Sequence, residues 1–412
     1  MMNKIRTGLL LAALLPLAAC VDNNGGGSTA VTAENFDFVG MLANYTDTII
    51  VPNYDTFAQQ SADFNADTGP LAQYCNAIGS ADESSTRSAA QTAWRDAMSQ
   101  WQLTELHQLG PVLQNSGALR NRIHSYSRSA LVSTCGIDQS VVIADSDANF
   151  SVSNRASNQR GLGAIEYLLF NNNLSHTCPD QVSQTSDWNS RPENERKQLR
   201  CNYARRLAGD VAQAADSLAS AWETTGGNYR STFINPGNLN DSLKALSDAL
   251  FYLDTETKDS KLGIPTGINS GCSQRTCPTV VESRFAQTSL DNIRRNLQSF
   301  ITLLKGGDGL GFDDVIEQAG VPEVTDKLLA DSQLALAEID AMTTSLSEQL
   351  NSINDDASKE ACIAAAGNPD SARTVPVCNL YGYIRRITDT LKVGFVAAVD
   401  VDLPDRAQSD ND

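Results

Sequence analysis

The segment RGLGAIEYLLF, residues 160–170, places a single carboxylate beside an apolar helical stripe. Positions three and four apart share one face of a helix, so Gly163, Glu166 and Tyr167 are expected to point the same way. Each glycine inside a helix costs about 1 kcal/mol relative to alanine, so Gly161 and Gly163 need a reason. One interpretation is a ligand-binding carboxylate beside a space left by glycine. The other is close helix packing, with Glu166 hydrogen-bonded to a loop.

Two further segments carry candidate residues for the same site. Trp94 and Trp101 are seven residues apart and share a helical face, which favours core packing, and Glu105 lies four residues further on, where it would line the same cavity. The other segment contributes three adjacent polar residues, Glu282, Ser283 and Arg284. They form either a structural ion pair or part of a ligand-binding cluster.

The three histidines give no local sign of a metal centre. His107, His124 and His176 show no metal-ligand spacing with one another. The chain has no H-E-x-x-H, no G-x-S-x-G and no phosphate-binding loop. The absence of these motifs gives no support to a zinc peptidase, a serine hydrolase or a nucleotide-binding enzyme.

The elements that hold these residues are predicted to be helices. Four stretches have helical periodicity: residues 34–68 with a kink or break at Pro52, 84–112 ending at Gly110-Pro111, 192–223 and 325–353. Only SVVIADS, residues 140–146, resembles a strand. Residues 224–238 are rich in turn formers, and weakly similar segments occur on both sides of them. We therefore predict an all-α protein with two similar four-helix-bundle domains packed side by side.

The N-terminus has the features of an export signal. Lys4 and Arg6 precede an apolar run that is too short to span a membrane. The run ends in LAAC, which resembles a bacterial lipobox and implies lipidation of Cys20. Val21 in the next position favours sorting to the periplasmic face of the outer membrane. The predicted organisation is a signal peptide at 1–19, a lipidated Cys20 and flexible tether at 20–32, an N-terminal bundle at 33–225, a linker at 226–238, a C-terminal bundle at 239–403 and an acidic tail at 404–412.

The charge of the chain restricts its partners. The net charge is −18, and loss of residues 1–19 removes only Lys4 and Arg6, which leaves −20. Such a chain is repelled by nucleic acid and by anionic lipid. We therefore expect no nucleic-acid partner, and we expect membrane attachment only through the lipid anchor.

Eight cysteines remain when Cys20 is set aside. An even number in an exported protein predicts disulfide bonds, and the absence of any C-x-x-C argues against a zinc site. The sequence does not fix the pairing. We expect neighbours along the chain to pair: Cys75 with Cys135, Cys178 with Cys201, Cys272 with Cys277 and Cys362 with Cys378.

Several segments together resemble one known family. GLGAIEYLLF is similar to the G-x-H-x-x-E segment of the imelysin family, formerly classed as M75 peptidases. AWRDAMSQWQLTELHQLGPV resembles the family's tryptophan-bearing helix, and KLGIPTG followed by VESRFAQTSLDNIRRNLQSF resembles its second-half signature. The resemblance covers most of residues 30–400. It implies two helical bundles, a site at their interface, and an exported protein linked to iron uptake.

One departure from the family pattern affects the expected chemistry. The family histidine falls on Gly163, so only Glu166 of the histidine–carboxylate pair remains as a candidate metal ligand. The leading hypothesis is a non-enzymatic protein that binds iron or another divalent metal, or a metal-loaded or haem-loaded partner protein. The alternatives are an M75-type metallopeptidase and a scaffold that binds no metal. We also expect Gly163 to mark a position from which a metal ligand has been removed.

Overall fold

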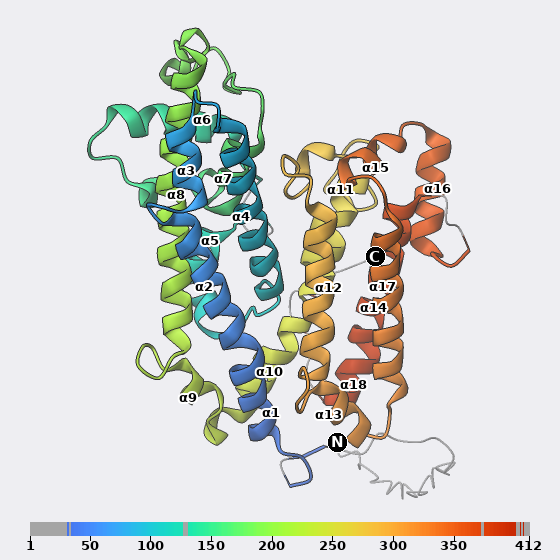
Figure 1. The fold of residues 1–412 in the computed structure, drawn as a ribbon. Coiled ribbons are helices and arrows are strands. Elements are labelled where there is room, and N and C mark those ends of the chain that lie inside the picture. Colours follow the sequence, from blue (N-terminus) through green and yellow to red (C-terminus); the bar gives the residue numbers. More distant parts are fainter. Residues whose placement is uncertain are drawn as a thin grey trace, which may run out of the picture.

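The computed structural model describes residues 31–32, 34–126, 131–371, 375–400, 404 and 407. Within these ranges every regular element is a helix and no strand occurs, which confirms the all-α prediction. The helices form two elongated groups that lie side by side (Figure 1). The predicted signal peptide, Cys20 and nearly all of the acidic tail lie outside the described residues.

Four helices form the N-terminal bundle. They are α2 (Val51–Asn65), α4 (Glu83–Thr104), α7 (Gly161–Phe170) and α8 (Glu193–Trp222). Glu193 and Glu195 lie in the first turn of α8, where their negative charges interact favourably with the positive end of the helix dipole. Every residue of α7 is buried, because α4 and α8 pack against it together with two shorter helices. The shorter helices of this half are α1 (Phe38–Asn44), α3 (Pro70–Ala77), α5 (Gln114–Ile123), α6 (Thr134–Ser146) and α9 (Tyr229–Phe233).

A second bundle is built from the C-terminal half. Its long elements are the π-helical segment η8 (Leu253–Gly263), which continues α10 (Leu239–Leu250), and the helices α12 (Ser289–Lys305), α14 (Glu323–Ala341) and α17 (Pro376–Thr390). Shorter helices are α11 (Ile264–Thr266), α13 (Phe312–Gln318), α15 (Leu346–Ser352), α16 (Asp356–Gly367) and α18 (Val396–Val399). Long π-helical segments are rare and often mark functional positions.

The two bundles meet along α4 and α12, which face each other in Figure 1. Side chains of α12 bond directly to α4. Asn296 Nδ2 donates to the carbonyl of Gln102 at 2.8 Å, and Ser299 Oγ donates to the carbonyl of Leu103 at 2.7 Å. The interface is therefore polar as well as apolar, and it can hold charged side chains.

Helix α1 and the residue that follows it also contact the second bundle. Asn44 Nδ2 donates to the carbonyl of Gly306 at 2.7 Å, and the Tyr45 hydroxyl donates to the carbonyl of Leu303. The same hydroxyl accepts from the backbone N–H of Phe312 at 3.1 Å. Burial raises the pKa of Tyr45 above its usual range, so this hydroxyl stays neutral.

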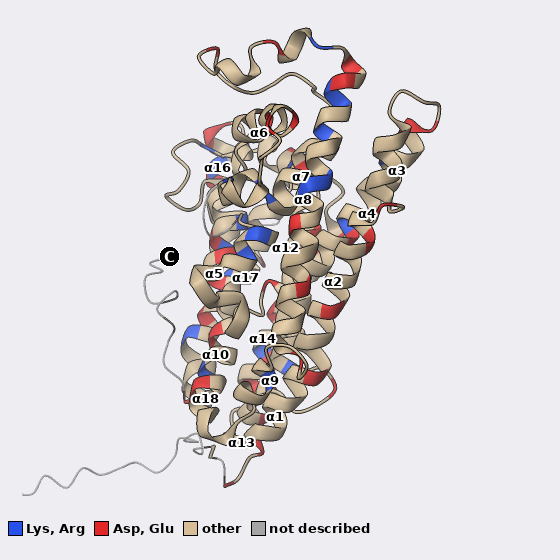
Figure 2. Cartoon of the chain, turned by 90° about the vertical axis from the view of Figure 1, so that its left-hand side faces the viewer, with Lys and Arg blue, Asp and Glu red and all other residues tan. Residues whose placement is uncertain are grey.

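Charged residues are spread along several helices of the face shown in Figure 2. In Figure 2 acidic residues recur along α2 and α4, and basic residues lie along the upper part of α8. No helix in the described ranges is long and apolar enough to cross a membrane.

The bounds of individual elements differ in detail from those expected from the sequence. Of the expected kink or break at Pro52, the break does not occur, because a π-helical segment, η1 (Tyr45–Ile50), runs directly into α2. The long helix predicted over 325–353 stops at Ala341, because Ser345 and Glu348 form a capping box that starts a new helix. The strand-like residues 140–146 belong to α6, since Ser133 caps a helix that runs through them.

All eight expected cysteines form disulfides, but half of the expected pairing is wrong. Cys272–Cys277 and Cys362–Cys378 pair as neighbours. The other two bonds are Cys75–Cys201 and Cys135–Cys178. Cys75 lies on α3 and Cys201 on α8, and these helices pack together although 126 residues separate the cysteines. Spatial neighbours here are set by helix packing and not by order along the chain.

We predict that the longest-range disulfide stabilises the fold most. By the chain-entropy relation, a closed loop of 126 residues contributes about 5 kcal/mol and a loop of 5 residues about 2 kcal/mol. A Cys75→Ser/Cys201→Ser double variant should therefore unfold at lower urea concentration than a Cys272→Ser/Cys277→Ser control. Equal midpoints for the two variants would contradict this ranking.

Candidate metal centre at the bundle interface

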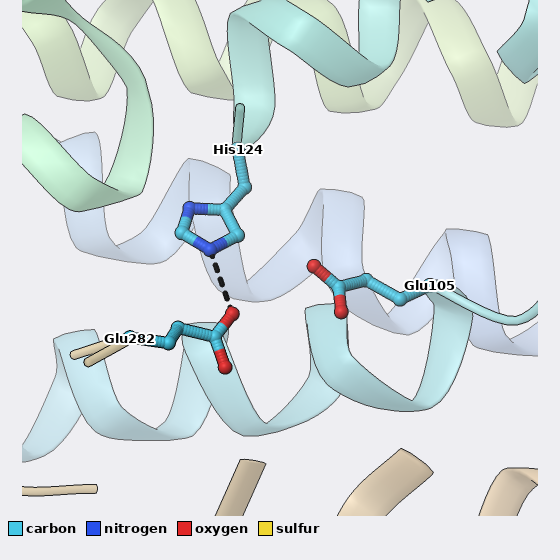
Figure 3. Close-up of side chains that lie close together, drawn as sticks. All are labelled: Glu105, His124 and Glu282. Carbon is cyan, nitrogen blue, oxygen red and sulfur yellow. Dashed lines mark hydrogen bonds and ion pairs between the residues drawn. The ribbon is translucent and has the colours of Figure 1, made fainter. Parts of the chain in front are cut away.

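Three buried side chains from distant segments converge between the two bundles. Glu105 lies at the C-terminal end of α4, His124 directly follows α5, and Glu282 lies in the loop before α12. One ligand atom from each lies within 4.8 Å of the others. Figure 3 shows the two carboxylates and the imidazole directed toward a common centre. We call this group the interface cluster.

Glu105 is held by aromatic side chains from both halves. Trp101 Nε1 donates to its Oε1 at 3.1 Å, and the Tyr252 hydroxyl donates to its Oε2 at 2.7 Å. Trp101 is thus a core residue, as expected, that also orients the carboxylate. The helix predicted to continue to Gly110 ends at Thr104, so Glu105 occupies the helix C-cap.

Trp94 has a structural role one step away from the cluster. Its Nε1 donates to the carbonyl of Leu162 at 3.0 Å, and its side chain is fully buried. This bond ties α4 to the first turn of α7. Trp94 therefore packs in the core, as expected. Its hydrogen bond goes to α7 and not to the cluster carboxylates.

Polar side chains from three different segments bond to Glu282. Gln102 Nε2 donates to its Oε1 at 3.1 Å, and Asn292 Nδ2 donates to its Oε2 at 3.0 Å. His124 Nε2 lies 3.0 Å from Oε1. Burial would raise the pKa of Glu282, but the positive charge of Lys261 and the hydrogen bond from His124 lower it to about 2. The side chain is therefore a carboxylate at neutral pH.

A buried ammonium group lies against both carboxylates. Lys261 on η8 places Nζ 2.7 Å from Glu105 Oε2 and 3.1 Å from Glu282 Oε2. Burial alone would lower the pKa of Lys261, but these two carboxylates outweigh burial and raise it. The lysine therefore carries a positive charge and balances part of the negative charge of the cluster.

Gly161 is required by a close backbone approach. Its φ is +73°, and a Cβ there would lie 2.6 Å from the carbonyl oxygen of Ile123. No other residue type adopts this conformation and leaves this space. The start of α7 therefore packs directly on the last residue of α5, which fixes the chain just before His124.

The space beside Gly163 is occupied by side chains. A Cβ at this position would lie 2.9 Å from Val132 Cγ2 and 3.8 Å from the Cε1 and Nδ1 atoms of His124. A larger residue at 163 would require Val132 to move. The expected ligand vacancy is thus filled, and the imidazole beside Gly163 comes from His124, in another segment.

Glu166 bonds to a loop of the second half. Its Oε1 accepts from the backbone N–H groups of Phe285 at 2.7 Å and Ala286 at 2.9 Å. Successive N–H groups of this kind form an anion-binding nest. Ser283 and Gln287 on either side have φ values of +49° and +58°, which shape the loop around the carboxylate. This arrangement matches the packing interpretation of the glycine segment.

A small cavity lies beside Glu166 and reaches His124 of the interface cluster. It has a volume of about 20 Å³, and Gly163, Glu166, His124 and Ser283 contribute to its lining. This is enough for about one water molecule or one ion. Burial raises the pKa of Glu166 to about 7, although its two backbone hydrogen bonds partly oppose the shift.

The remaining sequence candidates lie near the cluster but have other partners. Tyr167 directs its hydroxyl to both oxygens of Asp138 at 3.0 Å, away from the cluster. Ser283 Oγ accepts from Asn292 Nδ2 at 3.0 Å. Arg284 donates to the carbonyl of Thr279 and lies 4.7 Å from the centre of the Phe285 ring. It is therefore not the ion-pair partner of Glu282.

Sequence reasoning missed the histidine and the lysine of this site. His124 has no ligand spacing with another histidine, so only the fold brings it to Glu282. His107 is fully buried outside the cluster, and burial lowers its pKa to about 3. Lys261 had a local signal, because it is a charged residue at the start of the apolar stretch KLGIP.

The donor set of the interface cluster fits a divalent metal. Two carboxylates and one imidazole suit iron, zinc or manganese. Ligand atoms about 2.1 Å from a metal lie at most about 4.2 Å apart, so side chains within 4.8 Å of one another need to close by only roughly half an ångström. The Lys261 ammonium group contacts both carboxylates. The ammonium group and a metal would therefore compete for the same oxygen atoms.

We predict that Glu166 makes the stability depend on pH. Its pKa in the folded protein, about 7, lies above the ordinary value of 4.5, so folding favours the protonated form. Stability should fall as the pH rises from about 4.5 through 7, by on the order of 3 kcal/mol in total. Glu166→Gln should remove this slope in urea unfolding measured from pH 5 to 8. The prediction is wrong if the free energies of unfolding of the wild-type protein and the variant differ by the same amount at every pH in this range.

Comparison with known proteins gives a consistent result. A family model described as Imelysin, peptidase M75, matches residues 50–369. No curated protein matches the chain. The crystal structure of an imelysin-like protein from Psychrobacter arcticum 273-4 has a TM-score of 0.64 at 15% identity, covering 92% of this chain and 99% of that chain.

A second crystal structure shows the same architecture. It is that of a protein classed as an iron-regulated protein A precursor from Parabacteroides distasonis ATCC 8503, with a TM-score of 0.64 at 13% identity, covering 92% of this chain and 98% of that chain. At these identities the likeness concerns the fold. The family model spans more than three quarters of the sequence, and the chain therefore belongs to the imelysin family.

Proposed function

We propose that this protein binds a divalent metal ion at the interface of its two bundles and acts in iron acquisition without catalysing a reaction. The observation that carries the proposal is the interface cluster of Glu105, His124 and Glu282. Two buried carboxylates are costly unless cations balance them, and Lys261 supplies only one positive charge. Because both halves of the chain supply ligands, metal binding would also join the two bundles.

The family and one structural relative support the link to iron. The solved relative from Parabacteroides distasonis is classed as iron-regulated. Carboxylate and imidazole ligands together are common in non-haem iron proteins. Iron, or a divalent ion in its place, is therefore the proposed ligand, and a metal-loaded or haem-loaded protein of the same uptake system is the proposed partner.

A binding role fits the site better than the peptidase alternative. A zinc peptidase needs an open metal position where water and a polypeptide substrate meet. The cavity beside the interface cluster has a volume of about 20 Å³, which cannot admit a peptide. The scaffold alternative differs from the proposal in one respect only, because it requires that no metal binds.

The metal experiment uses purified residues 28–412 equilibrated with iron, copper and zinc. We predict about one bound metal per chain, detected by elemental analysis after gel filtration. Glu105→Gln and Glu282→Gln should each weaken binding by about 10–100-fold, since each removes a charged ligand. Asp210→Asn is a matched control, because Asp210 pairs with Arg122 on the outside of the bundle.

Either alternative would show itself in the same preparation. Metal-free protein after equilibration with all three ions would support the scaffold. Chelator-sensitive cleavage of an unfolded protein, lost in Glu282→Gln, would support the peptidase.

We further propose that lipidated Cys20 anchors the protein to the periplasmic face of the outer membrane. The support is the LAAC sequence that follows a basic and apolar N-terminus. We predict that Cys20→Ser moves the protein from the membrane fraction to the soluble periplasmic fraction. Unchanged fractionation of the variant would refute the anchor.

A further inference from the structure

Lys261 occupies the centre of a four-oxygen shell. Its Nζ lies 2.7 Å from Glu105 Oε2 and 3.1 Å from Glu282 Oε2. Two amide oxygens complete the shell, Gln102 Oε1 at 2.5 Å and Asn296 Oδ1 at 2.8 Å. Two carboxylates and two amide oxygens around a single positive charge are the kind of ligands that hard divalent cations bind.

The shell is assembled from both bundles. Gln102 and Glu105 lie on α4 or at its C-terminal end, whereas Glu282 and Asn296 belong to the loop before α12 and to α12 itself. The lysine comes from η8 and is 1% exposed. Neither carboxylate could remain charged in this place without a nearby cation, because burial of an unpaired charge is strongly unfavourable.

The shell oxygens are themselves fixed by hydrogen bonds. Trp101 and Tyr252 donate to Glu105, and Asn292 donates to Glu282. Asn296 donates its Nδ2 to the backbone carbonyl of Gln102. Hydrogen bonds of this kind orient the oxygen atoms of the shell, as the outer partners of metal ligands do at metal sites.

We propose that Lys261 is the resident cation of the bundle interface, and that a divalent metal binds there only by displacing the Lys261 ammonium group from Glu105 and Glu282. This inference rests on the proposed function, because it names the residue that controls metal affinity at the same site. The oxygen-rich shell also predicts the class of ion. Manganese(II), which accepts oxygen ligands and the His124 imidazole, should bind better than copper(I), which prefers sulfur.

The decisive variant is Lys261→Met, which keeps most of the side-chain volume and removes the charge. We expect its affinity for Mn²⁺ to exceed that of the wild-type protein by on the order of 100-fold, because an ammonium a few ångströms from the metal repels it strongly. Mn²⁺ should also restore the thermal stability that the variant loses without metal. Calorimetric titration and thermal unfolding with and without Mn²⁺ provide the two readouts.

Lys258→Met is the matched control. Lys258 lies one turn away on η8, is fully buried, and pairs with Asp259 at 3.0 Å in the second bundle. Its loss should also destabilise the protein, but Mn²⁺ should not restore stability. A Lys261→Met/Glu105→Gln double variant should lose the gain in affinity, because one carboxylate ligand is absent.

The outcomes separate this inference from the proposed function. Binding of Mn²⁺ by Lys261→Met and not by the wild-type protein would support the inference, and the proposed function would then rest on the separate test with iron, copper and zinc. Equal affinities in the wild-type protein and Lys261→Met would overturn the inference and leave the proposed function intact. If Lys261→Met does not fold without metal, refolding in the presence of Mn²⁺ supports the inference, and failure to refold with it overturns the inference.

Discussion

The contact of the Lys261 ammonium group with Glu105 and Glu282 is the interaction on which the interface of the two bundles depends. Each carboxylate belongs to a different half of the chain, and both are buried. Their mutual repulsion would separate the bundles if no cation lay between them. The hydrogen bonds from Trp101, Tyr252 and Asn292 hold the carboxylates in place but supply no net charge. A cation at this position is therefore a structural requirement, whether lysine or a metal supplies it.

Backbone packing in α7 determines which imidazole reaches the cluster. Because Gly161 has no side chain, the start of α7 lies against the carbonyl of Ile123, and the next residue of that segment is His124. Gly163 leaves room for the edge of the His124 ring. The glycines thus offset their helix penalty by bringing a histidine from another segment to Glu282. Glu166, on the same helix, ties α7 to the loop that carries Glu282 through the N–H groups of Phe285 and Ala286.

The interface cluster brings side chains of both bundles to one place. The candidate ligand atoms come from the end of α4, the residue after α5 and the loop before α12, so an ion bound to them would contact both bundles at once. The cavity beside them admits about one small ion or water and no larger molecule.

The sequence by itself determined the all-α class, the two bundles, the involvement of all eight expected cysteines in disulfides, and Glu105, Glu166 and Glu282 as candidates. These follow from periodicity, composition and motifs, which are local properties of the chain. Only the tertiary structure decided that Cys75 pairs with Cys201, that His124 lies beside Gly163, and that Lys261 binds both cluster carboxylates. Each of these contacts joins residues far apart in sequence, and no local pattern specifies them. They arise because helix packing brings distant segments together. At the interface, burial then forces the charged groups to pair.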